Sequence, residues 1–345
     1  MSPEHGTPAP GAPSAGTPAP GTQATGVPAD RSPVIDVHSH YIPPAYWDAV
    51  TARVAADATF ASLAARNNLV PQDPAGPMRT VEARIGGMDE AGVDVSVLSL
   101  PPPGASVRPG DAELSRRMND DLVAAAEKFP DRLRVLATVP LPDVAAATAE
   151  LARILPHPLV RGVAVTSDLS AWKLDDPALD PVFARVAGAG MPLFVHPALE
   201  PVPDAYADFA LTASISAVVS STLGVLRMIY HGTFDRLPEL TVIMPHLGGV
   251  IPYLLARLDD LGGRQRAREP VAYYLTHHLV LDTCSYHPPA FRCALETVGA
   301  RRLALGTDYP FRGTLARAVA DVRQHRLPAA EEAAVLGGNV ARWFG

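Results

Sequence analysis

The chain has 345 residues, of which 48% are apolar, so it is long enough for two average domains or for one large barrel. The net charge of −7 and the pI of about 5.9 exclude a general affinity for polyanions, and no run of basic residues interleaved with aromatic ones predicts nucleic-acid binding. The two cysteines, Cys284 and Cys293, exclude a disulfide framework and fit a reducing cytoplasm.

The first 32 residues differ from the rest of the chain. They repeat Gly-Thr-Pro-Ala-Pro and hold almost no large apolar residue, so they cannot bury enough surface to offset the entropy cost of ordering. We expect residues 1–32 to form a disordered tail and residues 33–345 to form the folded domain. The tail lacks the apolar stretch of a signal peptide, and no later stretch looks long enough to span a bilayer. The sequence therefore predicts a soluble cytoplasmic protein with no membrane contact.

From Val34 onward, short apolar runs alternate with helical patterns. Asp111, Asp143 and Asp176 each precede a helical pattern, as is typical of helix starts. The expected strands are residues 34–40, 93–100, 133–139, 160–166, 192–196, 240–246, 279–285 and 303–308. The expected helices lie near residues 79–91, 111–128, 143–155, 178–189, 212–230, 250–261, 288–298 and 314–325. Eight strands that alternate with eight helices predict an α/β fold, a closed (β/α)8 barrel of the TIM type. An open doubly wound sheet is the lesser alternative, weakened because no Gly-x-Gly-x-x-Gly follows the first strand.

One connection is unusually long. Residues 41–78 separate the first expected strand from its helix, whereas such loops usually have a few residues. The segment contains Tyr41, Tyr46, Trp47 and Phe60. We therefore expect it to be an insertion that caps the mouth of the barrel.

Several histidines and one aspartate lie at the ends of expected strands, where enzymes with this fold have their active sites. Reactive groups of barrel enzymes lie at the carboxyl ends of the strands. Five metal-capable or acid–base residues end expected strands: His38, His40, His196, His246 and Asp308. Because side chains alternate along a strand, the two histidines of His-x-His face the same side and can share a cation. Asp36 lies on that face as a candidate to orient a histidine, and Asp282 and Ser285 are lesser candidates for such a supporting role.

Ordered motifs along residues 33–345 resemble the second amidohydrolase family, which includes aminocarboxymuconate semialdehyde decarboxylase and decarboxylases of hydroxylated aromatic acids. The resemblance is carried by "IDVHSHYIPP" (35–44), "GMDEAGVDVSVLSLPPPG" (87–104), "LFVHP" (193–197), "GTFDRLPELTVIMPHLGGVIPYLLAR" (232–257), "LALGTDYPF" (303–311) and "GGNVARWFG" (337–345). His-x-His alone is a weak signal, whereas the ordered set is specific.

The resemblance implies a role for each strand-end residue. Members of the family hold one divalent metal through four residues, which correspond here to His38, His40, His196 and Asp308. The family's acid–base catalyst corresponds to His246. Its members are often dimers in which an arginine eleven residues later reaches the neighbouring site and binds the substrate carboxylate, which corresponds to Arg257. The resemblance therefore implies a homodimer that acts on a small carboxylate.

Departures from the family pattern concern the substrate and the number of metals. We find no match in residues 41–78 for the family's substrate-binding arginine, and "HPALEP" follows the fifth strand where decarboxylases carry a tryptophan. The fourth strand ends in "VAVTSD" without the lysine that bridges two metals in larger relatives, which favours a single metal. Three imidazoles and one carboxylate suit zinc best, with manganese and iron as alternatives.

The expected reaction is non-oxidative decarboxylation of a hydroxylated aromatic or muconate-like acid, with His246 delivering a proton to the carbon that bears the carboxylate. Arg257 and Arg312 are candidates to anchor anionic groups, and Tyr309 and Phe311 are candidates to line the pocket. The alternative is a metal-dependent hydrolase or hydratase acting on an amide, a lactone or an unsaturated acid. The same residues serve both reactions.

Overall fold

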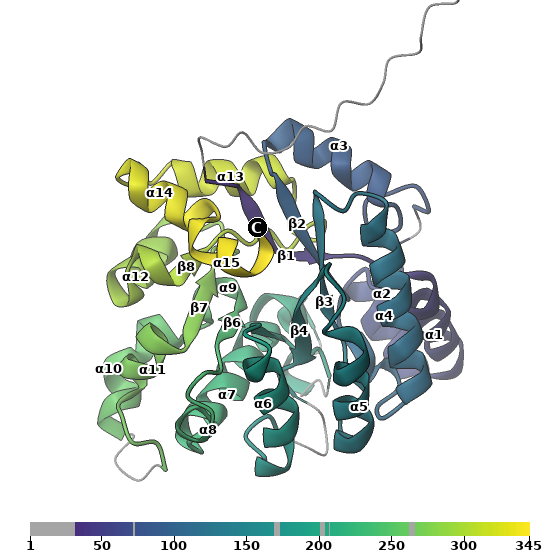
Figure 1. Ribbon diagram of the computed structural model, residues 1–345, viewed down its shortest axis with the longest axis horizontal. Coiled ribbons are helices and arrows are strands. Elements are labelled where there is room, and N and C mark those ends of the chain that lie inside the picture. Colours follow the sequence, from purple (N-terminus) through teal and green to yellow (C-terminus); the bar gives the residue numbers. More distant parts are fainter. Residues whose placement is uncertain (1–31, 72, 169–172, 201–203, 207, 262–265) are drawn as a thin grey trace, which may run out of the picture.

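The computed structural model describes residues 32–71, 73–168, 173–200, 204–206, 208–261 and 266–345. The expected tail, residues 1–32, lies outside the described residues except for Ser32. Eight parallel strands form one sheet in the order β1 to β8, ringed by helices (Figure 1). The strands are β1 (Ile35–His40), β2 (Val95–Ser99), β3 (Leu133–Ala137), β4 (Val160–Thr166), β5 (Leu193–His196), β6 (Val242–Met244), β7 (Leu279–Asp282) and β8 (Leu303–Ala304).

The sheet closes on itself between β1 and the segment that follows β8. The backbone N–H of Val37 donates to the carbonyl of Leu305 at 2.9 Å, and the N–H of His40 donates to the carbonyl of Tyr309 at 2.8 Å. Because sequential strands pair throughout and the ends also meet, the sheet is a barrel. The predicted (β/α)8 architecture is confirmed.

The helices of the barrel follow the expected pattern closely. Asp111, Asp143 and Asp176 each accept a hydrogen bond from a backbone N–H near the start of a helical segment, as predicted. The helices that follow strands are α3 (Val81–Ala91), α4 (Ala112–Glu127), α5 (Val144–Ile154), α6 (Asp180–Gly188), α7 (Ala217–Tyr230), α10 (Ile251–Leu261), α12 (Pro288–Val298) and α13 (Leu315–Arg323). Shorter helices are α8 (Thr233–Arg236), α9 (Pro245–Gly248), α11 (Val271–His277), α14 (Ala329–Leu336) and α15 (Ala341–Phe344). Single turns are η1 (Gly104–Val107), η2 (Pro177–Leu179), η3 (Asp204–Tyr206), η4 (Thr212–Ser216), η5 (Ala300–Arg302) and η6 (Gly338–Val340).

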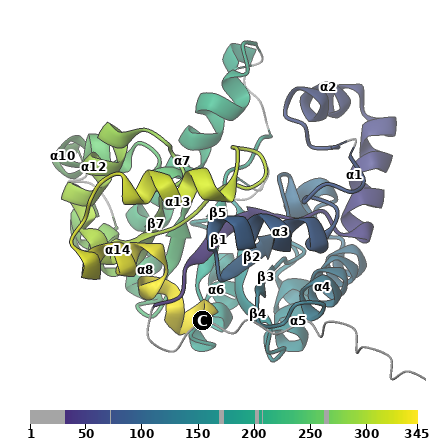
Figure 2. The ribbon, with the colours of Figure 1, turned by 90° about the horizontal axis from the view of Figure 1, so that it is seen from above.

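The insertion between β1 and α3 contains two helices that the sequence analysis did not predict. They are α1 (Pro44–Ala56) and α2 (Ala58–Arg66), and they lie together on the outside of the barrel near α4 (Figure 2). The Tyr46 hydroxyl donates to the carbonyl of Pro101 at 3.0 Å, which ties α1 to the loop after β2. Because that loop leaves the carboxyl end of its strand, the insertion lies next to the end of the barrel where the candidate residues gather.

The opposite end of the barrel is plugged by the C-terminal segment. Val340, Trp343 and Phe344 pack with inward-facing residues of the strands, among them Ile35 and Val97, in one buried apolar cluster. A second and larger cluster fills the space between the sheet and the helices. The barrel interior is therefore a packed core and not a pore, as is usual for this fold.

One segment passes the length and composition test for a membrane span. Thr212–Tyr230 has 19 residues, and 50% of its most apolar window is buried inside the protein. The expectation that no stretch reaches spanning length is therefore wrong for this segment. A helix packed against a protein core passes the same test, so it is weak evidence for a membrane protein.

Candidate metal centre

His38 and His40 lie side by side on β1, and both are fully buried. Their Nε2 atoms are 3.2 Å apart. In each ring the other nitrogen carries the proton. Nδ1 of His38 donates to Oδ2 of Asp282 at 2.6 Å, and Nδ1 of His40 lies 3.3 Å from Oγ of Ser99. The Ser99 hydroxyl donates its own proton to the carbonyl of Ser39, so its oxygen accepts a hydrogen bond from Nδ1 of His40. Both Nε2 atoms therefore turn a lone pair toward the same point.

His196, the last residue of β5, completes this arrangement of imidazoles. Its Nδ1 donates to the carbonyl of Pro197 at 3.0 Å, which leaves a lone pair on Nε2. That Nε2 is buried and has no hydrogen-bond partner among the described residues. Oδ1 of Asp308 lies 3.1 Å from Nε2 of His40 and 3.5 Å from Nε2 of His38. One ligand atom from each of these four residues lies within 4.8 Å of the others.

The four groups fit a divalent cation. Three imidazole lone pairs and a carboxylate oxygen converge in a buried space, and a buried acceptor without a donor is costly unless something positive meets it. Burial and the neighbouring imidazoles hold the pKa of His196 well below its usual value, which keeps the ring neutral. Burial raises the pKa of Asp308, but the surrounding histidines outweigh it and hold that pKa well below its usual range. His196 and Asp308 are therefore held in the protonation states that bind metal.

Asp282 orients this group from the end of β7. Oδ2 accepts from the His38 ring, and Oδ1 accepts from the backbone N–H groups of His246 at 2.8 Å and Cys284 at 3.0 Å. Burial lowers the pKa of His38, but the charge and hydrogen bond of Asp282 outweigh it and the pKa is raised. Among the candidate supporting residues, Asp282 therefore orients the His38 ring.

Asp36, the first candidate for that role, does not hydrogen-bond a histidine ring. Its carboxylate accepts from the hydroxyl of Thr307 at 2.8 Å and from the backbone N–H groups of Thr307 and His38. Burial raises the pKa of Asp36 to about 7. The expectation that Asp36 orients an imidazole is therefore wrong, and its carboxylate instead fastens the segment after β8 to β1.

His246 and Asp308 lie beyond their strands and not at the last strand residue as predicted. β6 ends at Met244 and β8 ends at Ala304. Both residues have a positive φ, 58° for His246 and 53° for Asp308, a conformation that side-chain-bearing residues rarely adopt. Nε2 of His246 lies 3.9 Å from Oδ2 of Asp308. The left-handed turn therefore brings His246 to the edge of the cluster, beside the carboxylate and outside the four-residue set.

Cys284 is a neighbour of the site that the sequence did not single out. Its thiol, Nε2 or Nδ1 of His246 and a nitrogen of His38 lie within 4.8 Å of one another. Burial raises the pKa of Cys284 well above its usual value. Its spacing from other cysteines gave no signal, because its neighbours come from β1 and from the turn after β6.

The family model described as amidohydrolase matches residues 35–345, nearly the whole of the described chain. The chain belongs to the amidohydrolase family. This match confirms the predicted resemblance.

Relatives of this amidohydrolase are decarboxylases by name. It is 27% identical over 277 residues to 2-amino-3-carboxymuconate-6-semialdehyde decarboxylase of Dictyostelium discoideum, covering 76% of each chain. It is 28% identical over 252 residues to gamma-resorcylate decarboxylase of Rhizobium sp. strain MTP-10005, covering 67% of this chain and 76% of that protein. The crystal structure of 5-carboxyvanillate decarboxylase from Sphingomonas paucimobilis matches with a TM-score of 0.81 and 26% identity, over 90% of this chain and 98% of that one. Three more structures with the same fold, each at 24% identity, were determined with bound manganese.

The candidate substrate residues of this amidohydrolase occupy different environments. The Phe311 ring lies 5.4 Å from the His40 ring, at the wall of the site. The Tyr309 ring packs toward α3, where its hydroxyl approaches Gly87 and its face lies 5.2 Å from the Arg84 guanidinium. Arg312 and Arg257 are exposed. Of these four candidates, Phe311 is the one whose ring contacts a member of the four-residue set.

Arg84 is a buried residue that the sequence analysis missed. It projects from α3 and is fully buried, and its Nη2 donates to the carbonyls of His40 and Pro77. Burial lowers the pKa of Arg84 to about 10. The side chain thereby ties α3 and the insertion to the end of β1, where the second histidine lies.

Proposed function

We propose that this protein is a metal-dependent, non-oxidative decarboxylase of a small hydroxylated aromatic or muconate-like acid, and that His38, His40, His196 and Asp308 hold its single metal. The observation that carries the proposal is that three buried imidazoles and the Asp308 carboxylate place their ligand atoms close together. Nε2 of His196 has no hydrogen-bond partner among the described residues. The decarboxylase relatives support the reaction type. Zinc suits this donor set best, and the manganese found in proteins of the same fold makes manganese the alternative.

When bound, the cation would supply the positive charge that holds a substrate carboxylate and an adjacent phenolic oxygen at the four ligands. His246 is the group of this chain placed to move a proton. Its side chain is 18% exposed, it lies outside the four-residue set, and the Asp282 carboxylate fixes its backbone. It delivers a proton to the ring carbon that bears the carboxylate. The bond from that carbon to the carboxylate then breaks, its electron pair returns to the ring, and CO2 leaves.

Phe311 and His40 form an apolar wall beside this reaction. Their rings meet edge to face at 5.4 Å, and the His40 ring is fully buried. Such a wall packs against the face or edge of an aromatic acid and displaces water from it. We propose Phe311 as a substrate contact and Arg312 as an anchor for an anionic substituent at the exposed rim. Tyr309, also proposed from the sequence as a lining residue, has its hydroxyl directed at α3.

We further propose that the protein is a homodimer in which Arg257 acts in the partner's site. Arg257 is exposed on α10 and forms no hydrogen bond or ion pair within the described part of the chain. Tyr253 and Leu261 lie four residues to either side, on the same helix face, and are 83% and 67% exposed. Large apolar side chains around an arginine are typical of the centre of a protein interface. The two free cysteines fit a cytoplasmic location.

The test uses purified protein loaded with Zn²⁺ or Mn²⁺ and a panel of hydroxylated benzoic acids and muconate-like acids. We expect release of CO2 together with one equivalent of the decarboxylated product. Protein stripped of metal by a chelator, and the His246→Asn variant, serve as controls and should release none above background. Hydrolysis of amides or lactones without CO2 release from any acid would contradict the proposal and favour a hydrolase.

A further inference from the structure

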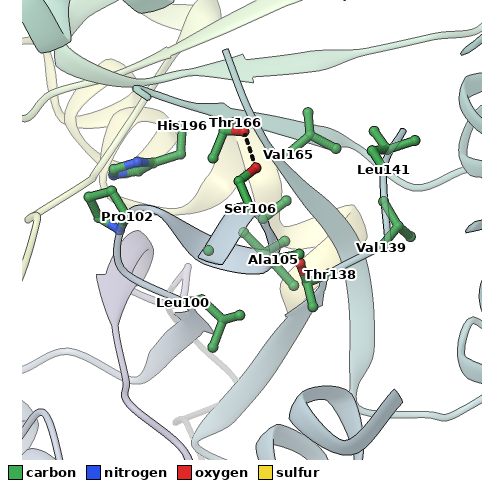
Figure 3. A pocket seen from close by; sticks show the side chains of 13 residues that line it. Leu100, Pro102, Ala105, Ser106, Thr138, Val139, Leu141, Val165, Thr166 and His196 are labelled. Carbon is green, nitrogen blue, oxygen red and sulfur yellow. Dashed lines mark hydrogen bonds between the residues drawn. The ribbon is translucent and has the colours of Figure 1, made fainter. Parts of the chain in front are cut away.

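A cavity begins at His196 of the metal centre, and His246 is not among the residues that line it. Its inner part is narrow, about 30 Å³, and runs from the His196 ring between the loop after β2 and the ends of β3 and β4 (Figure 3). Its outer part is wider, about 400 Å³, and reaches α1 and the segment after β5. The two parts share Ser106, Leu141 and Thr166 as walls. Space therefore continues outward beyond the narrow part next to the proposed ligand His196.

The walls of this side cavity are mostly apolar. Pro102 and Leu141 flank the inner part, and Ala198 and Leu199 flank the outer part. Neutral carbon atoms therefore fit the greater part of its length. Apolar contacts of this kind fix a ligand by burial, and a few polar groups set its orientation.

A pair of hydroxyl groups lies where the inner and outer parts meet. Oγ of Ser106 is 3.2 Å from Oγ1 of Thr166, the contact drawn as a dashed line in Figure 3. The Thr166 hydroxyl donates its proton to the carbonyl of Asp168 at 3.1 Å. Ser106 must then donate to Thr166, because each hydroxyl has one proton. The hydroxyl protons of Ser106 and Thr166 are therefore both donated within the protein, and the remaining lone pairs of the two oxygens can only accept hydrogen bonds. The ligand group that satisfies them is a hydrogen-bond donor.

The charged groups at the outer end are already neutralised. Nη2 of Arg53 on α1 donates to Oε1 of Glu200 at 2.8 Å, and Nζ of Lys173 lies 2.8 Å from Oδ2 of Asp168. A ligand that carried a further charge into the cavity would have to break one of these pairs or remain unpaired. The electrostatics therefore favour a neutral arm over an ionised one.

We infer that this side cavity binds a second arm of the substrate, and that Ser106 and Thr166 determine specificity for it. The inference rests on the proposed function and names its substrate class: a hydroxylated aromatic acid that carries, away from the reacting carboxylate, a short neutral substituent ending in a hydroxyl group. The arm passes His196, its carbon atoms pack on Leu141 and Ala198, and its terminal donor binds the hydroxyl pair.

The test compares three acids on the metal-loaded enzyme: 2,6-dihydroxybenzoate, the same acid with a hydroxyethyl arm, and the same acid with a propyl arm, each arm placed at ring positions 3 and 4. CO2 release gives kcat/KM, and calorimetry with the corresponding phenols gives Kd without turnover. We expect the hydroxyethyl compound to be preferred over the propyl compound at one ring position. Ser106→Ala and Thr166→Val should each reduce that preference about 3- to 10-fold, as loss of a neutral hydrogen bond does.

Ala198→Phe is the matched variant that fills the outer cavity. It should weaken both arm-bearing compounds more than it weakens 2,6-dihydroxybenzoate, with unaltered metal content and Tm as evidence of correct folding. Equal kcat/KM and Kd for the hydroxyethyl and propyl compounds, unaffected by Ser106→Ala, would overturn the inference while leaving a decarboxylase in place. If no acid releases CO2, the proposed function fails, and the phenol Kd values still decide whether the cavity selects a donor.

Discussion

Asp282 accepts a 2.6 Å hydrogen bond from Nδ1 of His38, and through its other oxygen it holds the backbone N–H of His246 at 2.8 Å. One buried carboxylate thus sets both the tautomer of a proposed metal ligand and the position of the proposed proton donor. A supporting carboxylate of this kind fixes ring orientation and raises the basicity of the ligand. Two residues with different roles therefore depend on the same side chain.

Asp282→Asn should lower metal affinity about 10- to 100-fold, as loss of such a partner typically does. The amide has no negative charge, and either its NH2 group faces the Nδ1–H of His38 or its carbonyl accepts more weakly. Metal Kd, measured by competition with a chromogenic chelator, checks this. Asp36→Asn is the control, because Asp36 is equally buried but hydrogen-bonds no ring. A fall in metal affinity as large for Asp36→Asn as for Asp282→Asn would contradict the assignment of the orienting role to Asp282.

Gly306→Ala should disturb the same carboxylate by steric contact. A Cβ at Gly306 would lie 2.7 Å from Cβ of Asp282 and 2.8 Å from its Oδ2, closer than real Cβ contacts allow. We expect a loss of stability of about 1–3 kcal/mol, typical of overpacking, together with weaker metal binding. Gly188→Ala is the matched control, because an added Cβ there meets nothing within 4 Å. Denaturant unfolding of both variants, with metal titration, measures the difference; equal behaviour of the two would show that Gly306 is not needed for the close approach.

His196→Asn and His246→Asn should separate metal binding from proton transfer. Loss of His196 removes an imidazole ligand, so bound metal and activity should fall together. Loss of His246 should leave the bound metal unchanged and lower kcat about 10²- to 10⁴-fold, the usual contribution of a general acid or base. Metal content by elemental analysis and kcat for the same preparations provide the comparison. If His246→Asn protein loses its metal, His246 is a ligand and the division of roles proposed here is incorrect.

Several of these relationships could be predicted from the sequence, and the reason is topological. In a parallel barrel every strand ends on the same rim, so His38, His40, His196 and Asp308 had to meet once the strands were identified. The local turns were less predictable. β6 and β8 end early, and the left-handed conformations of His246 and Asp308 depend on hydrogen bonds to Asp282 and to the carbonyl of His38.

Arg84 shows why other parts could not be predicted. A lone arginine in the pattern of a surface helix predicts an exposed side chain, because burying a guanidinium is costly. Its burial arises because the carbonyls of His40 and Pro77, from either end of the insertion, turn toward it. Neither these carbonyls nor the two helices of the insertion left a signal in the spacing of residues. The same holds for the hydroxyl pair of Ser106 and Thr166, which come from η1 and from the end of β4.

The pH dependence of the unfolding free energy should show that the pKa of His278 is depressed. His278 lies away from the metal centre, directly before β7. Burial lowers the pKa of His278, although its hydrogen bond to the carbonyl of Leu240 opposes the shift. Below its unfolded pKa of about 6.5, the unfolded chain binds a proton that the folded chain does not, so stability is lost as the pH falls. His278→Asn keeps a donor for Leu240 and cannot titrate. Between pH 7.5 and 5.5, wild type should lose more unfolding free energy in urea than the variant; an equal loss in both would argue against a depressed pKa.

Mixed dimers of two inactive variants test whether Arg257 acts in its partner's site. Arg257→Gln and His246→Asn homodimers should both have low kcat/KM. In a mixed dimer, one site combines the intact His246 of the Arg257→Gln chain with the Arg257 of the His246→Asn chain, so activity should reappear. If Arg257 acted within its own chain, no site in the mixed dimer would have both residues. Co-expression with two affinity tags isolates the mixed species, and the mutated pair Tyr253→Ala and Arg257→Gln on one chain provides a control in which the interface itself is weakened. Activity of the mixed dimer no higher than that of either homodimer, with dimer formation shown by sedimentation, would remove the role in trans and leave Arg257 as an exposed arginine of α10.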